Sequence, residues 1–248
     1  MSNFFSLKRN FPDVTDEQWV KLEALCTYFK EWNERINLVS RKDIEAFEIH
    51  HLMHAMTLSK VVHFESRSRV LDVGTGGGLP GLPLAILFPK VKFYLLDSIA
   101  KKIQAVRDMA ERLELKNVEV VHKRAEELES SFNYVLGRAV TNLPNFLGWI
   151  SKNLREGGDA EQPFGVLYFK GTLYKEELDA MELEPFKVHS LDSVVDEPYY
   201  EDKLLIHLDT SSVVAKVPPM APINPNKKAK KPTSKKQKRK RANSRWGK

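Results

Sequence analysis

The segment from Val70 to Pro83 is the part of the sequence best equipped to bind a small ligand. It reads VLDVGTGGGLPGLP, so an apolar run leads into five glycines within eight positions. Glycine permits positive φ angles and a close approach of the backbone to a ligand, and a following helix offers unpaired N–H groups. Pro80 suits the first turn of that helix. Because a structural turn alone needs one or two glycines, the segment predicts a ligand-binding loop between a strand and a helix.

The glycine spacing separates two classes of ligand that such loops bind. Counted from Gly74, the dinucleotide fingerprint GxGxxG has Leu79 where its third glycine should stand. The next predicted strand ends at Asp97, and a carboxylate at this place accepts hydrogen bonds from ribose hydroxyls. Both a dinucleotide and S-adenosylmethionine carry ribose, and Asp97 is also suited to cap the helix that follows. Asp97 therefore leaves the ligand open, whereas the broken fingerprint disfavours a nicotinamide-dependent oxidoreductase.

Two missing features restrict the methyl-transfer chemistry open to such a site. Methylation of a pyrimidine at C5 needs a cysteine nucleophile, and the only cysteine, Cys26, lies on the apolar face of a predicted helix. Methylation of an adenine amino group usually uses an Asn/Asp-Pro-Pro-aromatic motif after the fourth strand, where this chain reads Leu136-Gly137-Arg138-Ala139. A ring nitrogen such as guanine N7 needs neither, because its lone pair is already nucleophilic and requires only placement.

The elements that position these residues alternate between short apolar runs and amphipathic helical stretches. The predicted strands are 70–73, 92–96, 118–121, 134–136 and 166–169, and the predicted helices are 80–88, 100–113 and 143–153. This alternation predicts βαβ units, a parallel sheet and helices on both of its faces. The runs 186–191 and 204–208 have no long helix between them, so they predict a closing antiparallel hairpin.

The chain divides into three predicted parts. Residues 1–66 form a helical preface, because apolar residues recur every three or four positions in 11–37 and 43–62. Residues 67–210 hold the α/β domain. From residue 211 to residue 248 the sequence turns rich in proline and then in lysine and arginine, with few aliphatic residues, and we expect a disordered tail.

Charge separates the tail from the rest of the chain. Thirteen of the 39 basic residues, and none of the 33 acidic ones, fall between Lys216 and Lys248. The other 215 residues therefore carry 26 basic and 33 acidic side chains, a net charge of −7, although the whole chain is at +6. A flexible segment of this charge attracts RNA phosphates through counterion release without reading sequence. We expect 216–248 to tether the protein to RNA.

Composition also indicates where the protein works. No apolar run approaches the roughly 20 residues needed to cross a bilayer, and Met1–Asn10 lacks the apolar stretch of a secretory signal. A lone cysteine forms no internal disulfide, which fits a reducing compartment. We expect a cytoplasmic protein that makes no membrane contact and works as a monomer.

These residues together resemble the bacterial small-subunit (16S) ribosomal RNA guanine-N7 methyltransferases, also called the glucose-inhibited division protein B family. The glycine and proline string at 71–86 is the most specific part of the likeness. Weaker matches run through the rest of the body: Trp32-Asn33, Asn37-Leu38, Ser40, Leu95-Leu96-Asp97-Ser98, Lys101-Lys102, Arg124-Ala125-Glu126, Arg138-Ala139 and Lys170-Gly171. The resemblance implies a Rossmann-like class I methyltransferase sheet. It also implies methylation of guanine N7 in small-subunit RNA with S-adenosylmethionine, without a covalent intermediate.

The resemblance also assigns cofactor contacts residue by residue. Gly74 and Leu79 would touch the methionine and ribose portion, Asp97 the ribose, and Ala125 and Glu126 the adenine. The cofactor site implied in this way is completed by neighbouring residues: Thr75, Gly76, Gly77, Ser98 and Arg138.

For the RNA substrate, the resemblance implies three basic residues. Arg138 would stand beside the cofactor at the mouth of the site, and Lys170 and Lys203 would face RNA. The residues themselves leave an alternative for each, since Arg138 can pair with Glu126 and the two lysines can be solvated strand ends.

One departure from the family pattern lies in the second helical stretch, where many members have His-x-Leu-Asp-Ser. This chain reads His51-Leu52-Met53-His54-Ala55, so His54 stands in place of the carboxylate. His50 and His54 have the spacing of a metal pair, but no carboxylate or cysteine partner is evident nearby. We therefore predict no metal site and a packing or hydrogen-bonding role for His51.

A second class of function uses the same features. A ribosome-assembly protein could keep this fold, hold RNA with its tail and bind the cofactor only as structure. The intact glycine loop favours the enzyme over this non-catalytic alternative.

Overall fold

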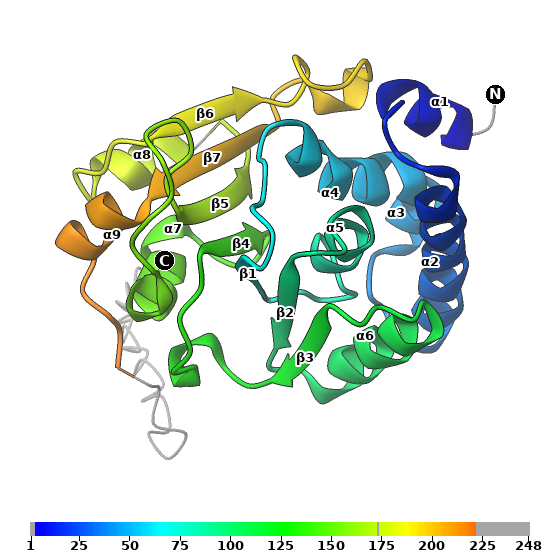
Figure 1. Cartoon of the computed structure of the whole chain (residues 1–248), viewed down its shortest axis with the longest axis horizontal. Helices are drawn as coiled ribbons and strands as arrows, with labels where there is room; N and C mark the ends of the chain where they lie inside the picture. The colour runs from blue at the N-terminus through cyan, green and yellow to red at the C-terminus, as the bar shows by residue number, and fades with distance from the viewer. Residues whose placement is uncertain (1–2, 173, 222–248) are drawn as a thin grey trace, which may run out of the picture.

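A computed structural model describes residues 3–172 and 174–221, and one seven-stranded sheet forms its centre (Figure 1). The strands are β1 (Arg69–Val73), β2 (Lys92–Asp97), β3 (Val118–His122), β4 (Tyr134–Arg138), β5 (Gly165–Lys170), β6 (Lys187–Ser190) and β7 (Leu204–Asp209). They lie in the order β3-β2-β1-β4-β5-β7-β6. Because the order reverses at β1, the ends of β1 and β4 flank a topological switch point, where open α/β sheets bind ligands.

The direction of the strands confirms the predicted fold class. The first five strands run parallel, and β7 inserts antiparallel between β5 and β6. This hairpin distinguishes the sheet from the dinucleotide-binding order 3-2-1-4-5-6. The sheet is the Rossmann-like class I methyltransferase type that the sequence resemblance implies.

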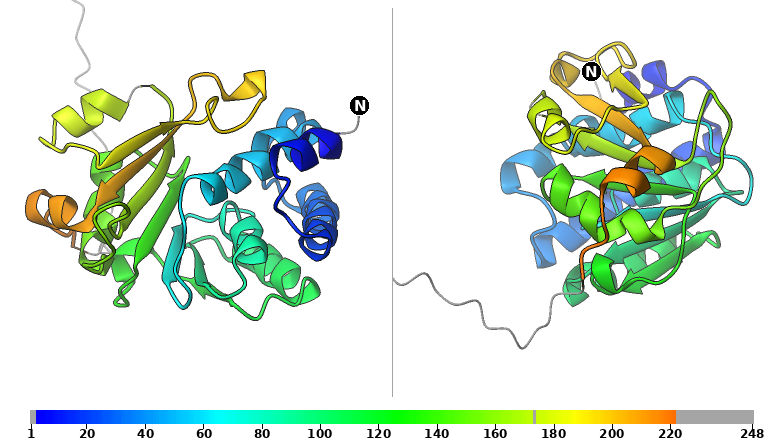
Figure 2. Two further views of the ribbon diagram at one scale, coloured as in Figure 1. Left: turned by 45° about the horizontal axis from the view of Figure 1, so that its top comes forward. Right: turned by 90° about the vertical axis from the view of Figure 1, so that its left-hand side faces the viewer.

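Helices cover both faces of the sheet (Figure 2). On one face lie α1 (Asn3–Asn10), α2 (Asp16–Arg35), α3 (Arg41–Glu45), α4 (His54–Met56), α5 (Gly81–Leu87) and α6 (Ala100–Arg112). On the other lie α7 (Leu143–Ile150), α8 (Tyr174–Asp179) and α9 (Thr210–Lys216). Successive strand residues alternate between the faces. Val70 accordingly packs in the core under the preface helices, and Leu71 packs in the core under α7 to α9.

The preface shares its core with the sheet, and its first long helix has well-defined ends. Thr15 caps α2 by accepting the N–H of Gln18, whose side chain accepts the N–H of Thr15. The helix ends at Arg35 because Ile36 is extended, at φ −140°. It is therefore shorter than the predicted 11–37. Helix α1, which the sequence reading missed, is held by the fully buried Leu7.

The stretch predicted as helical over 43–62 is helical, but it is not one regular α-helix. The segment is broken into α3, a π-helical turn (Glu48–Met53), α4 and a 3-10 turn (Thr57–Lys60). Phe47 and Leu52 are both fully buried and stand five residues apart. A π turn, with its i→i+5 spacing, places such a pair on one face, whereas a regular α-helix would rotate them apart.

The disorder predicted from residue 211 does not hold for the first part of that segment. Asp209 caps α9 by accepting the N–H of Ser212, and Val213 is fully buried. Beyond the helix, the N–H of Met220 donates to the carbonyl of Gly148 in α7. Two valines four apart, Val213 and Val217, supply the apolar contact that orders this stretch. Residues 222–248 lie outside the described residues, so the predicted tail and the three-part division of the chain stay predictions.

Shorter elements connect these parts: 3-10 turns at Ala125–Glu127, Ser151–Asn153 and Pro198–Tyr200. Among the described helices, none has both the length and the apolar character needed to cross a membrane.

Candidate functional site

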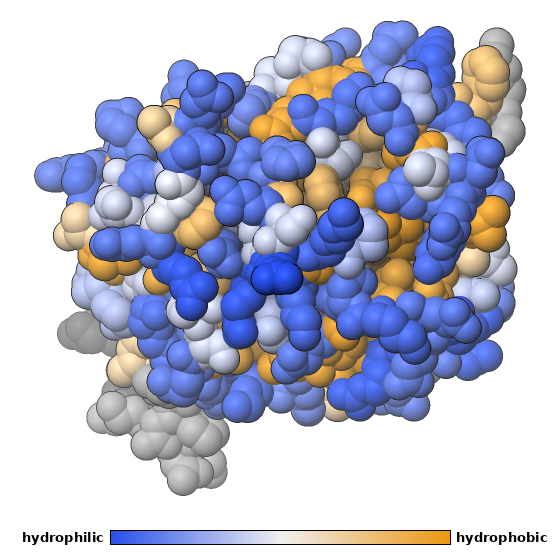
Figure 3. Space-filling model, viewed as in Figure 1, coloured by the Kyte–Doolittle hydropathy of each residue, from blue (hydrophilic) through white to orange (hydrophobic). Residues whose placement is uncertain are grey.

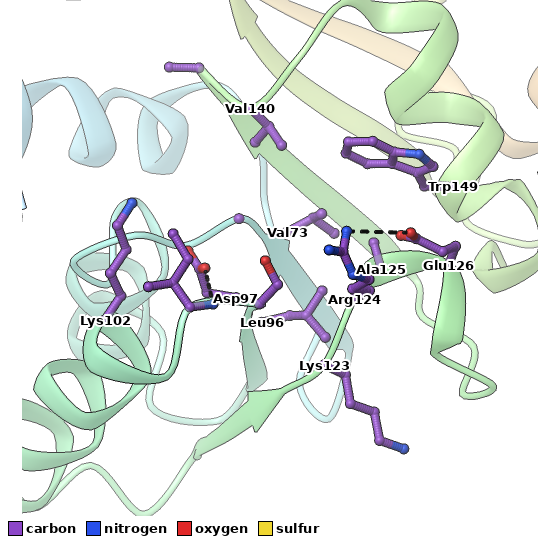
Figure 4. Close-up of a pocket in the computed structure, with 14 residues that line it drawn as sticks. Val73, Leu96, Asp97, Lys102, Lys123, Arg124, Ala125, Glu126, Val140 and Trp149 are labelled. Carbon is purple, nitrogen blue, oxygen red and sulfur yellow. Dashed lines mark hydrogen bonds and ion pairs between the residues drawn. The ribbon is translucent and has the colours of Figure 1, made fainter. Parts of the chain in front are cut away.

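The carboxyl ends of β1, β2 and β4 meet at one edge of the sheet, where a pocket of about 290 Å³ opens (Figure 4). We call it the first pocket. Half of the predicted cofactor residues line it: Gly74, Asp97, Ser98, Ala125 and Glu126. The other half do not: Thr75, Gly76, Gly77, Leu79 and Arg138.

The glycines of the loop after β1 serve different purposes. Gly74 and Gly76 have φ angles of +67° and +58°, which side-chain-bearing residues rarely adopt. A Cβ on Gly76 would meet no heavy atom closer than 3.9 Å, so this backbone faces open space. A Cβ on Gly74 would lie 3.0 Å from Val140, beyond the end of β4. Gly74 therefore lets the loop after β1 approach Val140 closely, and Gly76 leaves open space beside its backbone.

Gly77 instead packs against the preface, and we expect Gly77→Ala to destabilise the fold by about 1–3 kcal/mol. A Cβ at this position would lie 2.4 Å from Cε2 of Phe29 in α2. Urea unfolding measures the loss. Because the added methyl clashes with one ring, Gly77→Ala combined with Phe29→Leu should lose less than the sum of the two single changes. Additive losses would contradict the clash.

A buried carboxylate, Asp72 in β1, holds the loop from below. Its Oδ2 accepts the hydroxyl of Thr75 at 2.7 Å and the N–H of Gly81 at 2.9 Å. Thr75 is thereby turned away from the first pocket, and Leu79 is buried in the core. Asp72 was missing from the predicted site, although an acidic residue inside an otherwise apolar strand is a sequence signal for such a role.

Burial raises the pKa of Asp72 to about 6 from 3.8, against the lowering effect of its two hydrogen bonds. Between pH 4 and 6 the folded protein then binds more protons than the unfolded chain, so the stabilising contribution of Asp72 falls as pH rises through this interval. Asp72→Asn removes the titration and keeps one oxygen to accept both bonds. We expect the free energy of unfolding of the wild type, relative to Asp72→Asn, to fall by about 2 kcal/mol from pH 4 to 6. A difference that is constant or rises with pH would contradict the shift.

Asp97 joins the first two loops of the site. Its Oδ2 accepts the N–H of Gly76 at 3.0 Å, and its Oδ1 accepts the N–H of Ile99 at 2.9 Å, just before α6. Asp97 does not cap α6, because the N-cap is Ile99 and no side chain makes a capping bond there; the carboxylate instead holds the turn before the helix and lines the first pocket. One side chain fixes the loop and faces the ligand.

The far side of the first pocket combines apolar surface with an unpaired acceptor. Ile99 is 48% exposed although it is large and apolar, and Trp149 of α7 stands across the pocket (Figure 4). Glu126 is buried, and its Oε1 makes no hydrogen bond to any described residue. The nearest cation, Nη1 of Arg124, is 4.0 Å from this oxygen. The pocket thus offers two apolar side chains and a buried carboxylate oxygen that makes no hydrogen bond to a described residue.

A second pocket of about 410 Å³ adjoins the first, and Ala139 lines both. Its walls come from the ends of β4 and β5, the start of β7, and the preface. They include Thr141, Tyr168, Phe169, Gly171 and Asp202, with His54 on the preface side. Lys170 and Lys203, two of the predicted RNA-facing residues, also line it. The arrangement can hold two ligands whose reacting atoms meet near Ala139.

Arg138 does not line the first pocket, and it does not pair with Glu126. Its Nη2 is 3.3 Å from Nδ1 of His51, so it pairs with the preface rather than with Glu126. Burial, and then the nearby guanidinium, lowers the pKa of His51 to about 4, so this ring is neutral at pH 7 and accepts from Arg138. Asp72 is the acidic group that most favours the charged form of Arg138. Arg138 therefore links the preface to the back of the site.

The two lysines of the second pocket differ in how free they are. Lys170 donates to both carboxylate oxygens of Glu177, at 2.8 Å each. Lys203 donates to the carbonyl of Tyr199, and its ammonium lies 3.7 Å from the centre of the Tyr199 ring. Lys203 keeps further N–H donors for an anion. The charge of Lys170 is already balanced by the Glu177 carboxylate.

The histidines of the preface pack against aromatic rings. His50 stacks on Tyr199 with ring centres 3.8 Å apart, and His54 lies against Phe169. Burial lowers the pKa of His54 well below its usual range. Residues 3–172 and 174–221 contain no group of three side chains placed to hold a metal ion. Burial also raises the pKa of the Cys26 thiol, which keeps it from forming a nucleophilic thiolate at neutral pH.

Comparison with known proteins decides the family. Residues 18–199 match the family described as GidB, rRNA small subunit methyltransferase G. The chain belongs to this family. The ribosomal RNA small subunit methyltransferase G of Flavobacterium johnsoniae is 42% identical over 198 residues, which cover 80% of this chain and 94% of that one. The protein of the same name from Bacteroides thetaiotaomicron is 41% identical over 201 residues, covering 79% and 95%.

Among solved structures, the precorrin-6y C5,15-methyltransferase of Geobacter metallireducens superposes with a TM-score of 0.45 and 16% identity, covering 69% of this chain and 90% of that one. Membership of the rRNA small subunit methyltransferase G family confirms the resemblance seen in the sequence. With it, the expected ribosomal RNA methyltransferase with S-adenosylmethionine as its cofactor is confirmed. The roles of individual residues are not decided by membership.

Several residues that line the pockets of this methyltransferase were not predicted from the sequence: Ile99, Lys123, Val140 and Trp149 in the first pocket, and Thr141, Tyr168 and Asp202 in the second. The apolar ones read as core residues in a sequence pattern, because only their exposure in the folded chain marks them as ligand-facing. Lys102 was noted as a family match but was given no role.

Proposed function

We propose that this protein transfers the methyl group of S-adenosylmethionine to N7 of a guanine in small-subunit ribosomal RNA. The observation that carries the proposal is the pair of pockets that share Ala139 at the carboxyl edge of the sheet. Family membership supplies the RNA and the cofactor, and the geometry supports a direct transfer between two ligands held side by side.

The first pocket suits the cofactor. We assign the adenine ring to the slot between Ile99 and Trp149, where its exocyclic amino group can donate to the unpaired Oε1 of Glu126. Asp97 would then hold the ribose hydroxyls, and Gly74 would lie beside the methionine end. An orphaned buried acceptor and an exposed isoleucine are both costly without a ligand, which supports this fit.

The second pocket suits the guanine. Tyr168 and Phe169 offer flat apolar walls, and the carboxylate of Asp202 can accept the N1–H and N2–H donors that distinguish guanine from adenine. We assign Lys203 to a phosphate of the same nucleotide, with Lys170 and Arg138 holding the walls in place.

The reaction itself requires no bond to a side chain and no proton transfer by one. Bound S-adenosylmethionine supplies an electrophilic methyl group, and the guanine N7 lone pair forms the new N–C bond as the S–C bond breaks. Because N7 carries no proton, the chain needs no general base and no covalent intermediate. Its contribution is to exclude water and align the two reacting atoms, which accounts for large rate gains.

Labelled methyl transfer tests the proposal. The purified protein is incubated with isotope-labelled S-adenosylmethionine and small ribosomal subunits from cells that lack it, and the digested RNA is analysed by mass spectrometry. We expect label in 7-methylguanosine. Label in another nucleoside would contradict the guanine N7 assignment.

The same assay separates the enzyme from a non-catalytic assembly factor. Gly76→Val places a branched side chain at φ +58°, beside the N–H that the Asp97 carboxylate accepts. An enzyme should lose cofactor binding, label transfer and its cellular effect together. A cellular effect that survives in Gly76→Val would favour the assembly factor.

We further propose that the enzyme acts as a cytoplasmic monomer and that its residues 216–248 hold RNA phosphates. The thirteen basic residues in this range support the tether. Sedimentation gives the oligomeric state, and a chain ending at residue 221 should bind small subunits more weakly and with a smaller salt dependence than the full chain.

A further inference from the structure

A separate basic pocket lies at the amino ends of β1 and β2, at the edge of the sheet opposite the candidate site. It has a volume of about 480 Å³. Five of the residues that line it are cations: Arg67, Arg69, Lys90, Lys92 and Lys116. No described residue lining the pocket is acidic, and none of these five side chains forms an ion pair within the described part of the chain.

The guanidinium of Arg69 is held in position by two aromatic rings. Its guanidinium lies 4.6 Å from the centre of the Tyr94 ring and 5.3 Å from that of Phe132. Its Nε is buried and has no hydrogen-bond partner among the described residues. Aromatic faces thus fix the side chain, and its guanidinium makes no hydrogen bond to any described residue.

The cations of this pocket are close enough to repel one another. Arg69 and Lys92 are register partners on adjacent parallel strands, which lie about 4.8 Å apart. Like charges placed side by side in this way destabilise a sheet. Figure 3 shows strongly hydrophilic residues near the middle of this face, over the segment that leads into β1. A bound anion would remove this repulsion.

The basic pocket is positively charged, whereas the chain outside 216–248 has a net negative charge. Outside 216–248 the chain carries a net charge of −7, so most of its surface does not attract a polyanion. A phosphate backbone is drawn to places where several unpaired cations converge. The second pocket has Lys203 as a cation that pairs with no acidic side chain among the described residues, while the basic pocket has five such cations.

We propose that this basic pocket binds backbone phosphates of the RNA substrate at nucleotides other than the methylated one. The proposal rests on the proposed function in taking ribosomal RNA as the partner. β1 has five residues, so the basic pocket stands about 15 Å or more from the glycine loop. The phosphates it holds therefore belong to a neighbouring part of the folded RNA, and the contact orients the particle on the enzyme.

The test compares two double charge reversals that alter the net charge equally. Lys90→Glu with Lys92→Glu changes the pocket. Lys175→Glu with Lys187→Glu changes exposed lysines of α8 and of β6, the strand at the opposite end of the sheet from β3. The dissociation constant for methyl-deficient small subunits is measured over a range of salt concentrations. We expect the pocket variant to bind roughly tenfold or more weakly than the control, with a salt slope smaller by about 2.

Measurements of turnover and folding show whether the loss in the pocket variant is confined to particle binding. Affinity for S-adenosylmethionine, kcat at saturating particle and the unfolding midpoint should match the control variant, and Lys90→Gln with Lys92→Gln should weaken binding in the same direction. Equal binding by the pocket and control variants would overturn the proposal. The proposal would also be overturned if inorganic phosphate bound in the pocket and left particle binding unchanged, since this result would indicate a small-anion site.

The two proposals fail in different ways. Binding to the particle is measured without methyl transfer, so a pocket variant that binds poorly supports the phosphate contact whichever nucleoside is labelled. Absence of 7-methylguanosine would overturn only the proposed reaction.

Discussion

Asp97→Asn is expected to weaken binding of S-adenosylmethionine about 100-fold, as measured by calorimetry. Each oxygen of the carboxylate accepts a backbone N–H, one from Gly76 and one from Ile99. An asparagine has one acceptor, so its amide NH2 must face one of these N–H groups, and the charge that favours the ribose hydroxyls is lost. Hydrogen bonds to charged groups contribute about 1.5–3 kcal/mol each, which corresponds to roughly this change in affinity.

Asp209→Asn is the matched control for Asp97→Asn. Its carboxylate also accepts a backbone N–H, that of Ser212 at the start of α9, but it lies away from the first pocket. The control should leave cofactor affinity unchanged while lowering stability modestly. Unaltered cofactor affinity in Asp97→Asn would show that the ribose does not bind there.

Gly171→Phe is expected to lower kcat/KM for small subunits by about 100-fold or more while leaving the affinity for S-adenosylmethionine unchanged. Gly171 lines the second pocket but not the first. A Cβ at this position would meet only the carbonyl oxygen of Asp202, at 3.9 Å, so a larger side chain fits without a clash and occupies the space of the base.

Gly171→Ala controls for the loss of glycine itself. One methyl group at ordinary contact distance should leave the second pocket open, and its kcat/KM should stay close to that of the wild type. If Gly171→Phe methylated RNA normally, the acceptor base would have to enter elsewhere. If it lost cofactor affinity as well, the two pockets would not be independent.

The fold was predictable where the signal is local. Buried parallel strands read as continuous apolar runs, so 70–73 and 134–136 were found at the right places, and the glycines between β1 and α5 marked the loop. The π turn and α9 depend on contacts with distant parts of the chain. Nothing near Val213 in the sequence announces the core of α7 and β7 on which it packs.

The candidate site likewise has one part that the order of the elements predicts and one part that depends on tertiary packing. Gly74 and Asp97 follow strands whose ends necessarily meet at one edge, so their convergence in the first pocket follows from the order of the elements. Arg138 was expected at the mouth, but its guanidinium meets His51, which is 87 positions earlier in the chain. Such a pairing depends on how the preface packs on the sheet, and spacing in the sequence carries no record of it.

His54 shows how packing changes the meaning of a residue. In the sequence it stands where the family pattern has a carboxylate, which suggested lost chemistry. In the fold it lies against Phe169 and lines the second pocket, with its pKa lowered by burial, so it is a neutral wall at pH 7. A neutral ring beside a base avoids placing a buried charge there.

The central claim is that cofactor and guanine occupy adjoining pockets that meet at Ala139. A crystal structure with S-adenosylhomocysteine and 7-methylguanosine monophosphate tests it most directly. The predicted result places the adenine between Ile99 and Trp149, the guanine ring beside Tyr168, and the sulfur and the N7 methyl facing each other near Ala139. A cofactor bound outside the first pocket, or a sulfur that faces away from the second pocket, would contradict it.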